Sequence, residues 1–329
     1  MKNHRTFMVA LLTTLVAAIA LADPAGSPAP KFLIGVWYQP MGNFAMWKSR
    51  GINTLLGYAS ENTVARDTWM EAARKAGLFY IVKPTDDPAD LKSDLADPNL
   101  LAWEQPDEPD GGGGIPPAKI VENYKTWKAA GDKPVLLNLD GWRTQYGKPE
   151  EYIEYCQGAD WIAFDYYILN RGEGPDNIKK IGERLDKLKE WTGGKKRLFV
   201  FIECSDQNLR VTDWAATPDA TGKPAGPRMR CPTADEMKQQ IDVAVAHGAS
   251  GIIYFPDVIG RGWESFDGTP PACDAAMKEV NRKLAAGDKG LSPSKAETPA
   301  PALKDHSKAP LDGTEITVDG VTYILKHKE

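Results

Sequence analysis

Carboxylate side chains gather where two apolar segments of the sequence end. Residues 100–110, LLAWEQPDEPD, run from an apolar stretch into Glu104 and then into Asp107 and Glu108, which Pro109 follows. Residues 199–203, FVFIE, end in the same way at Glu203. Two carboxyl groups can cleave a glycosidic bond, because one can protonate the leaving oxygen while the other attacks the sugar or activates water. The residue types therefore indicate chemistry carried by paired carboxylates.

The sequence offers little for other kinds of hydrolysis. None of its four histidines lies at the end of a predicted strand: His4 is near the N-terminus, His247 is in a predicted helix, and His306 and His327 are near the C-terminus. A Ser-His-Asp triad, a Cys-His pair or a histidine metal centre would therefore lack its base or its ligands. No CxxC pair and no GxxxxGK[ST] loop occurs. We expect no metal and no organic cofactor.

The segments that must position these carboxylates alternate between apolar runs and amphipathic stretches. The apolar runs are continuous, which is typical of strands buried on both faces. Strands are expected over residues 32–40, 52–59, 78–86, 99–108, 133–142, 160–169, 197–206 and 251–260. Helices are expected over residues 43–51, 63–77, 87–96, 116–132, 149–159, 177–191, 233–249 and 273–286. This repeat predicts an α/β fold, a (β/α)8 TIM barrel. The competing doubly wound sheet would carry a glycine fingerprint after its first strand, and YQPMGNF has none.

In such a barrel, catalytic groups lie at the C-terminal ends of the strands. The acids expected there are Asp86, Glu104, Asp107, Glu108, Asp140, Asp165, Glu203, Asp206 and Asp257. Glu104 lies further back along its strand than Glu108, so we expect it to point into the layers of the barrel. Lys83 is the main basic group, and we expect it to pair with an acid. An imine-forming lyase or aldolase that uses Lys83 is one alternative.

The strand ends resemble those of the clan A retaining glycoside hydrolases. In that clan the fourth strand ends in Asn-Glu, often followed by Pro, and the seventh ends in Glu; the matching residues here are Asp107-Glu108-Pro109 and Glu203. The resemblance implies that Glu108 is the acid/base and Glu203 the nucleophile. It also implies that Tyr166 or Tyr167, near the end of the sixth strand, hydrogen-bonds the nucleophile.

The resemblance follows the barrel by strand position, and each motif is a few residues long. Asp107 departs from it, because the clan's Asn donates a hydrogen bond to a sugar hydroxyl and an ionised Asp can only accept one. This departure predicts altered sugar recognition, or an activity that has drifted from that of the clan.

A carbohydrate is the expected substrate, because sugar rings stack on flat aromatic side chains and their hydroxyls need oriented polar groups. The predicted binding residues are Asp107, Trp37, Tyr38, Gln39, Asn138, Asp140, Trp142, Tyr166, Tyr167, Trp214 and Trp263. The predicted enzyme is a secreted hydrolase that cleaves a β-linked oligo- or polysaccharide with retention. A carbohydrate-binding barrel without catalysis is the main alternative.

The N-terminal segment predicts export. Residues 1–22 join the basic MKNHR to an apolar run that ends in Ala20-Leu21-Ala22, the pattern of a cleavable signal peptide. An uncleaved membrane anchor is the alternative, although the run is short for a span. We therefore expect a secreted or periplasmic protein that is free of the membrane after cleavage. The net charge of −5 argues against a nucleic-acid partner.

The remaining predictions concern cysteines and the C-terminal region. Export would allow disulfides among the four cysteines, and Cys231 with Cys273 is the preferred pair because both precede predicted helices. Residues 23–287 are the predicted barrel domain and residues 288–310, rich in Pro, Ala, Ser and Lys, are a predicted linker. Residues 311–329 are expected to form a β-hairpin around Asp319-Gly320.

Overall fold

The computed structural model describes residues 29–58, 64–111, 114–205, 231–259 and 263–287, together with the backbone of residues 315–318 and 321–324. The chain divides into two compact units, residues 1–291 and residues 292–329. The predicted signal peptide and linker lie outside the described residues. Among the residues described, no helix has the length and apolar character needed to cross a membrane.

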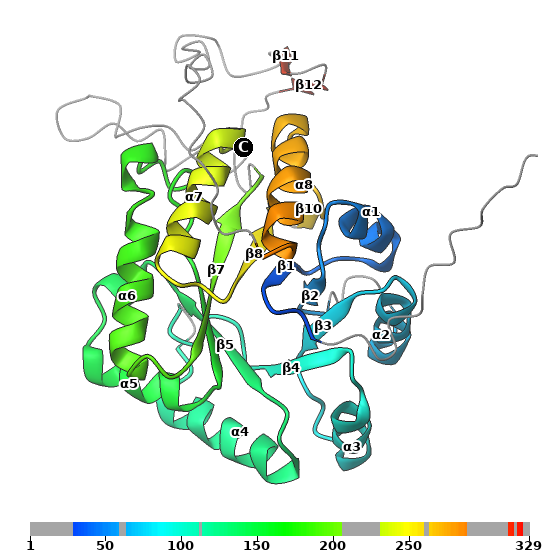
Figure 1. The fold of residues 1–329 in the computed structure, drawn as a ribbon, viewed down its shortest axis with the longest axis vertical. Coiled ribbons are helices and arrows are strands. Elements are labelled where there is room, and N and C mark those ends of the chain that lie inside the picture. The colour runs from blue at the N-terminus through cyan, green and yellow to red at the C-terminus, as the bar shows by residue number, and fades with distance from the viewer. Residues whose placement is uncertain are drawn as a thin grey trace, which may run out of the picture. The chain divides into compact units, whose positions relative to one another are not determined.

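The first unit is a closed barrel of parallel strands, in which each strand pairs with the next and β8 pairs with β1 (Figure 1). The prediction of a (β/α)8 TIM barrel is confirmed. Its strands are β1 (Leu33–Trp37), β2 (Thr54–Leu56), β3 (Phe79–Val82), β4 (Leu100–Glu104), β5 (Val135–Asp140), β6 (Trp161–Asp165), β7 (Arg197–Glu203) and β8 (Gly251–Phe255).

A helix follows each strand and covers the outside of the barrel (Figure 1). These helices are α1 (Phe44–Ser49), α2 (Arg66–Lys75), α3 (Pro88–Ala96), α4 (Pro117–Ala130), α5 (Pro149–Gln157), α6 (Lys180–Thr192), α7 (Ala234–Ala246) and α8 (Pro271–Ala285). Short 3-10 turns occur at η1 (Met41–Asn43), η3 (Arg143–Gln145) and η4 (Pro175–Asn177).

Two helices begin at side chains that satisfy their free backbone N–H groups. Asp87 accepts a hydrogen bond from the backbone N–H of Ala89 at the start of α3. Thr233 and Glu236 form a reciprocal capping box at the start of α7. Such caps contribute on the order of 1 kcal/mol each, so these boundaries are set locally by the sequence.

The hydrophobic core has two layers. One lies between the strands and the helices, and the other fills the barrel interior. The interior layer contains Leu33, Trp37, Leu56, Ile81, Ala102, Leu136, Ala163, Phe199, Phe201, Ile253 and Phe255. Because side chains alternate along a strand, Glu203 shares the inward side of Phe201, and Asp165 shares that of Ala163. The acids that end these strands therefore face the axis of the barrel.

The last strand is shorter than predicted. β8 ends at Phe255, because Pro256 follows and has no N–H to offer a ladder. The chain then forms a two-stranded antiparallel sheet from β9 (Val258–Ile259) and β10 (Trp263–Ser265). In the second unit, β11 (Glu315–Val318) pairs antiparallel with β12 (Val321–Ile324). The predicted turn residues Asp319 and Gly320 are outside the described part of the chain.

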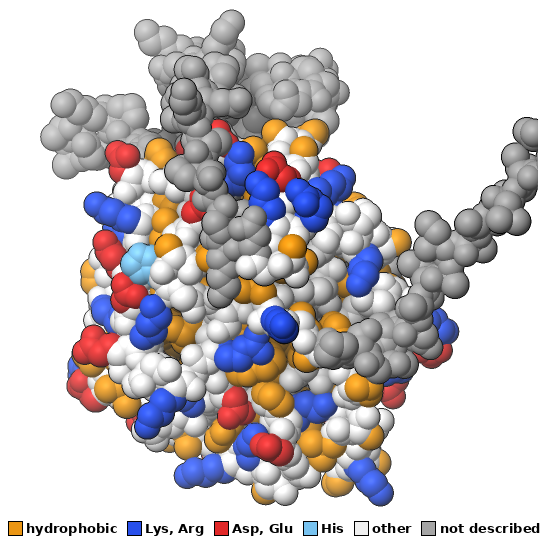
Figure 2. Space-filling model, viewed as in Figure 1, with side chains coloured by type: hydrophobic (Ala, Val, Ile, Leu, Met, Phe, Trp, Pro, Cys, Tyr) orange, Lys and Arg blue, Asp and Glu red, His pale blue; other side chains and the backbone are white. Residues whose placement is uncertain are grey.

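The surface carries charges of both signs. Figure 2 shows acidic and basic side chains interspersed over one face, with small apolar areas between them. No field of a single sign dominates this face.

Candidate active site

The predicted acids meet at one end of the barrel, which we call the mouth and which is formed by the C-terminal ends of β1–β8. Asp140 and Asp165 are register partners on β5 and β6. Glu203, the last residue of β7, is the register partner of Phe255 on β8. The loop after β4 adds Asp107 and Glu108. Carboxyl groups from four strands therefore reach the same end.

Glu108 lies in an unusual backbone conformation. Its φ is 40°, and Tyr38 at the end of β1, with φ 52°, is the other non-glycine residue with positive φ in the described part of the chain. Non-glycine residues rarely adopt this region, which costs about 1–3 kcal/mol and occurs most often at functional sites. The backbone N–H of Gly111 donates to the carbonyl of Glu108 at 2.7 Å. Two features therefore fix the Glu108 backbone: Pro109, as predicted, and the hydrogen bond from Gly111.

Gly111→Ala tests this turn. A Cβ at position 111 would lie 2.8 Å from the Glu108 carbonyl oxygen and 3.7 Å from its Oε2. The backbone of Glu108 must then shift, so we expect any activity of the site to fall about tenfold or more, because catalysis is sensitive to small misplacements. Gly42→Ala is the matched control, since nothing lies within 4 Å of its added Cβ. Equal activities of both variants would contradict a positioning role for the turn.

Asp165, the last residue of β6, interacts with Glu108 at the mouth. Burial raises the pKa of Asp165 well above its ordinary value, and the neighbouring charges of Glu108, Asp107 and Asp140 raise it further. Oδ1 of Asp165 is buried and has no hydrogen-bond donor among the described residues. These surroundings therefore favour the protonated form of Asp165.

Asp107 is bound by a neighbouring strand. The side-chain amide of Asn138, on β5, donates to Asp107 Oδ1 at 2.9 Å. Asp107 is exposed as a whole residue, whereas its carboxyl group is desolvated by the surrounding protein. This partial desolvation, with the charge of Glu108 beside it, raises the pKa of Asp107 to about 6, although the Asn138 hydrogen bond opposes the shift. One acceptor oxygen of Asp107 is therefore already bound by Asn138.

Glu203 has no exposed surface and is held by the loop after β6. Its carboxylate accepts hydrogen bonds from the backbone N–H groups of Leu169 at 3.1 Å and Asn170 at 2.7 Å. The side-chain amide of Asn170 adds a third bond at 3.0 Å. These donors favour the ionised form, but burial outweighs them and raises the pKa of Glu203 to about 7. Sequence reasoning did not identify Asn170.

The raised pKa of Glu203 predicts a change of stability with pH. The folded protein holds this proton up to about pH 7, whereas an unfolded Glu loses it near its ordinary value of 4.5. The stabilising contribution is therefore complete below about pH 4.5 and is lost as the pH rises through about 7. Chemical denaturation of the parent and of Glu203→Gln should show the parent losing up to about 3 kcal/mol relative to the variant over this range. A constant difference would contradict the assignment.

Tyr167 links the predicted catalytic residues. Its ring packs against Phe255, with the ring centres 5.2 Å apart. Burial raises its pKa well above the ordinary value, and the charges of Asp165, Glu108, Asp107 and Glu203 raise it further. The charges of Glu108 and Glu203 therefore both act on the Tyr167 hydroxyl.

Two predicted sugar-binding residues have no surface for a ligand. Gln39 is fully buried, and its side chain bonds the backbone carbonyls of Trp37 and Phe266 and the Nε1–H of Trp47. Tyr166 is buried on the outer side of β6, where its hydroxyl donates to Glu173. The guanidinium carbon of Arg184 lies 3.5 Å from the centre of the Tyr166 ring. Gln39 and Tyr166 therefore have structural roles. Of the two predicted tyrosines, Tyr167 is the one that packs against the interior layer.

Trp37 and Tyr38 lie at the mouth but differ in exposure. Trp37 is 8% exposed and contributes to the interior layer, where its ring meets that of Phe201 at 5.6 Å. The half-buried ring of Tyr38 stacks on Trp37 at 5.6 Å. These two rings form an aromatic wall on the β1 side of the mouth.

The loop after β5 carries an exposed aromatic surface. Trp142 is 37% exposed and Tyr146 is 67% exposed, and their ring centres are 5.6 Å apart. The guanidinium of Arg171 lies 5.5 Å from the Trp142 ring. Asp140 shapes the loop by accepting from the backbone N–H groups of Trp142 and Arg143. A flat ligand could stack here, and Tyr146 is an addition to the predicted set.

Four further residues from the sequence analysis complete the set. Trp214 lies in residues 206–230, outside the described part of the chain, and Trp263 belongs to β10 but its side chain is not described. Glu104 is buried inside the barrel as expected, and burial and the charge of Asp107 raise its pKa well above the ordinary value. Lys83 is exposed and lacks the desolvated surroundings that make imine-forming lysines nucleophilic.

The predicted disulfide is absent from the structure. Among the described residues, no disulfide joins Cys231 to Cys273. Cys273 is buried at the start of α8, and its thiol donates to the backbone carbonyl of Pro232 at 3.4 Å. The position of both cysteines before helices does not bring the sulfur atoms into a bond. No group of three or more His, Cys, Asp or Glu side chains in the described ranges is arranged to hold a metal ion.

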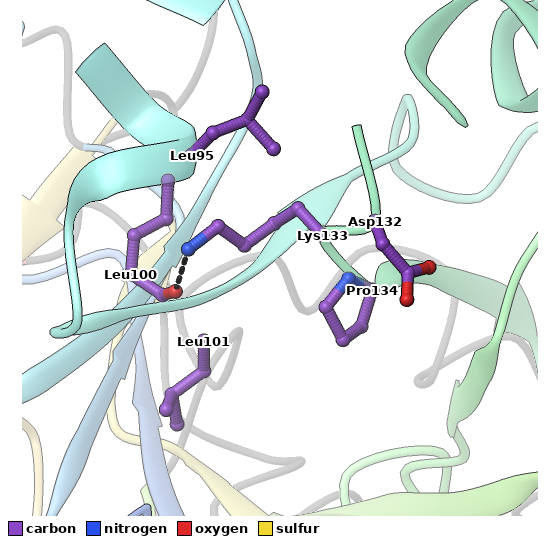
Figure 3. A pocket seen from close by; sticks show the side chains of 6 residues that line it. All are labelled: Leu95, Leu100, Leu101, Asp132, Lys133 and Pro134. Carbon is purple, nitrogen blue, oxygen red and sulfur yellow. Dashed lines mark hydrogen bonds between the residues drawn. The ribbon is translucent and has the colours of Figure 1, made fainter. Parts of the chain in front are cut away.

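A pocket lies at the other end of the barrel (Figure 3). Its volume is about 350 Å³, and it is lined by Leu95, Leu100, Leu101, Asp132, Lys133 and Pro134. The Lys133 ammonium donates to the backbone carbonyls of Leu100 at 2.9 Å and Asp97 at 3.0 Å. Because these residues precede or begin β4 and β5, the pocket is remote from the carboxylates and its lysine has a structural partner.

Comparison with known proteins finds structural neighbours of low similarity. No family model and no curated protein matches the sequence. A glucosidase from Croceicoccus marinus is similar in structure with a TM-score of 0.47 and 15% identity, over 79% of this chain and 69% of that chain. An endo-1,4-β-D-mannanase from Thermotoga petrophila gives 0.46 and 12%, over 77% and 99%.

A 3-deoxy-D-arabino-heptulosonate 7-phosphate synthase from Thermotoga maritima gives a TM-score of 0.41 and 17% identity, over 78% of this chain and 88% of that chain. Glycoside-active enzymes and an enzyme of another class thus share this likeness. Similarity of this degree does not assign a reaction, because barrels of this kind host many chemistries.

Proposed function

We propose that the protein is an exported glycoside hydrolase that cleaves a β-linked oligo- or polysaccharide with retention of configuration. Glu108 is the acid/base and Glu203 is the nucleophile. The observation that supports this best is that Glu203 ends β7 on its inward side while Glu108 follows β4 at the same end of the barrel. The reaction requires two carboxyl groups, and in barrels of this type catalytic groups lie at this end.

The proposed reaction has two steps. A carboxylate oxygen of Glu203 bonds to the anomeric carbon while the glycosidic C–O bond breaks, and the leaving oxygen takes the proton of Glu108. In the second step the carboxylate of Glu108 removes a proton from water, whose oxygen attacks the same carbon and releases Glu203. Half-buried Glu108 can contact both the sugar and solvent in these roles.

The surroundings of Glu203 affect how it can act as a nucleophile. The donors from Leu169 and Asn170 fix the carboxylate and balance part of its charge. Its pKa of about 7 means that it is fully ionised only above that pH. We therefore expect kcat/KM to fall as the pH drops below about 7. Because Glu203 has no exposed surface, a sugar must displace the groups that cover it.

The burial of Glu203 favours a second candidate, a barrel that binds carbohydrate without cleaving it. In that case Glu203 is a structural carboxylate that anchors the loop at Leu169 and Asn170. The exposed rings of Trp142 and Tyr146 would then supply the binding surface.

One experiment separates the two candidates. The protein without residues 1–22 is incubated with β-glucans, mannans, xylans and galactans, and both binding and reducing ends are measured. The first anomer released from a cleaved glycan is identified by proton NMR. The proposal predicts cleavage with the β-anomer formed first. Binding with no new reducing ends supports the second candidate, and the α-anomer would contradict retention.

A further inference from the structure

The turn after β5 is held firmly by the barrel, although it exposes aromatic rings. Asp140 accepts from the backbone N–H of Trp142 at 2.8 Å. Arg184, on α6, donates to the carbonyl of Gly141 at 2.6 Å. The buried ring of Tyr166 stacks on Trp142, with the ring centres 6.4 Å apart. The turn is therefore preorganised, which lowers the entropic cost of binding a ligand.

Two exposed rings stand together on this turn. The exposed large hydrophobic side chains in the described ranges are Trp142, Tyr146 and Ile153. The ring centres of Trp142 and Tyr146 are 5.6 Å apart, so the two form a patch rather than scattered single residues. An exposed apolar patch rimmed by polar groups is typical of an interaction site.

Arg171, in the loop after β6, adds a positive charge beside these rings. Its side chain is exposed, and its guanidinium carbon lies over the Trp142 ring, 5.5 Å from the ring centre. Among the described residues, no carboxylate forms a salt bridge with it; Glu173, the acid of the same loop, binds Lys180 at 2.7 Å. A guanidinium that lies over an aromatic ring keeps the N–H donors of its own plane, which can bind both oxygens of a carboxylate.

The loop that carries Arg171 also holds the proposed nucleophile. Asn170, the preceding residue, donates its backbone N–H and its side-chain amide to Glu203 at 2.7 and 3.0 Å. The surface formed by Trp142, Tyr146 and Arg171, which we call the outer platform, therefore adjoins the mouth. A glycan bound at Glu203 can extend over it.

We propose that the outer platform binds a sugar unit that carries a carboxylate, so that the substrate is a glycan containing uronic acid. The sugar ring stacks on Tyr146 and the edge of Trp142, and its carboxylate forms a bidentate pair with Arg171. The inference rests on the proposed function in treating the glycan as a substrate, whereas binding itself needs no turnover.

The charges of the mouth decide where the uronic acid unit lies. Asp107 and Glu108 would repel a carboxylate held beside them, because like charges brought together weaken binding. At the platform, the nearest acid of the β5 turn is Asp140, which Arg143 faces at 3.5 Å. The sugar whose bond is cleaved is therefore neutral, and the expected substrate has a neutral backbone that carries uronic acid units.

The binding test uses glucuronoxylan, a neutral backbone with uronic acid branches, and its carboxyl-reduced form, in which each carboxylate has become an alcohol. The full chain is titrated with each glycan, and the affinity is measured by calorimetry. We expect the acidic form to bind about tenfold more tightly, the effect of one charge-assisted pair. Equal affinities, or no binding of either form, would overturn the proposal.

Substitutions assign the effect to the platform. Arg171→Met keeps a side chain over Trp142 but removes the charge, so it should lower the affinity for glucuronoxylan about tenfold and leave the reduced form unchanged. Arg282→Met, at an exposed position on the outer helix α8, is the matched control and should change neither affinity. Tyr146→Ala should weaken both forms, because stacking does not depend on the carboxylate. Equal losses for both forms in Arg171→Met, or no loss, would overturn the role of Arg171.

Two further comparisons separate the alternatives. Dextran sulfate that binds as tightly as glucuronoxylan would overturn the choice of a carboxylate over another anion. Glucuronoxylan that binds as predicted but is not cleaved would keep the platform and refute the proposed function. Cleavage of neutral glycans with no preference for the acidic form would keep the proposed function and refute the platform.

Discussion

Replacing Glu203 with glutamine is expected to abolish glycoside cleavage. An amide cannot attack the anomeric carbon, so turnover should fall by about a thousandfold or more, which corresponds to over about 4 kcal/mol of transition-state stabilisation. The loss should affect substrates with good and poor leaving groups alike, because the nucleophile is needed for both. Hydrolysis rates with an aryl glycoside and with a natural glycan check this.

The same substitution should also lower the free energy of unfolding, because it disturbs the hydrogen bonds around residue 203. A glutamine can keep its carbonyl oxygen towards Asn170, but its NH₂ group would then face the backbone N–H of Leu169. One buried donor loses its partner, at a cost of about 1–3 kcal/mol near neutral pH before the compensating effect of the removed charge. Circular dichroism and ligand binding should show that the variant is folded. A folded Glu203→Gln variant that turns over at the parent rate would contradict the nucleophile assignment.

Glu108→Gln should lower activity in a manner that depends on the leaving group. A glycan whose leaving oxygen needs a proton should be cleaved about 10²–10⁴-fold more slowly, the usual contribution of a general acid. An aryl glycoside that leaves as a stable phenolate needs no proton, so its first step should be much less affected. Rates across a series of aryl leaving groups measure this dependence.

Glu154→Gln provides the matched control for both substitutions, because Glu154 is an exposed glutamate on the outer helix α5. It should leave rates and unfolding unchanged. If Glu108→Gln slowed all leaving groups equally, Glu108 would not be the acid, and Asp165 would become the candidate for that role.

The sequence predicts the scaffold well because the scaffold depends on local and periodic patterns. Continuous apolar runs and amphipathic helices specify strands buried on both faces with helices outside. A parallel barrel then brings all the strand ends to one mouth, which is why Asp107, Glu108, Asp140 and Glu203 could be placed there. The early end of β8 follows from Pro256, a signal present in the sequence but not used to place the boundary.

The details of the site depend on features that periodicity does not encode. β1 ends at Trp37, and the positive φ of Tyr38 then redirects the chain, so Gln39 turns into the protein rather than towards a ligand. The backbone conformation of Glu108 depends on the turn that Gly111 closes. Strand parity could have separated Tyr166 from Tyr167, because Ala163 and Asp165 mark the inward side of β6.

The most direct measurement is covalent trapping of the nucleophile. A 2-deoxy-2-fluoro glycoside of the preferred sugar, with an activated leaving group, should form a stable ester with the attacking carboxylate, and peptide mass spectrometry then identifies the modified residue. Labelling on Glu203, abolished in Glu203→Gln, is the predicted result. Labelling on Asp165 or another acid, or hydrolysis that proceeds while Glu203 stays unmodified, would contradict the account.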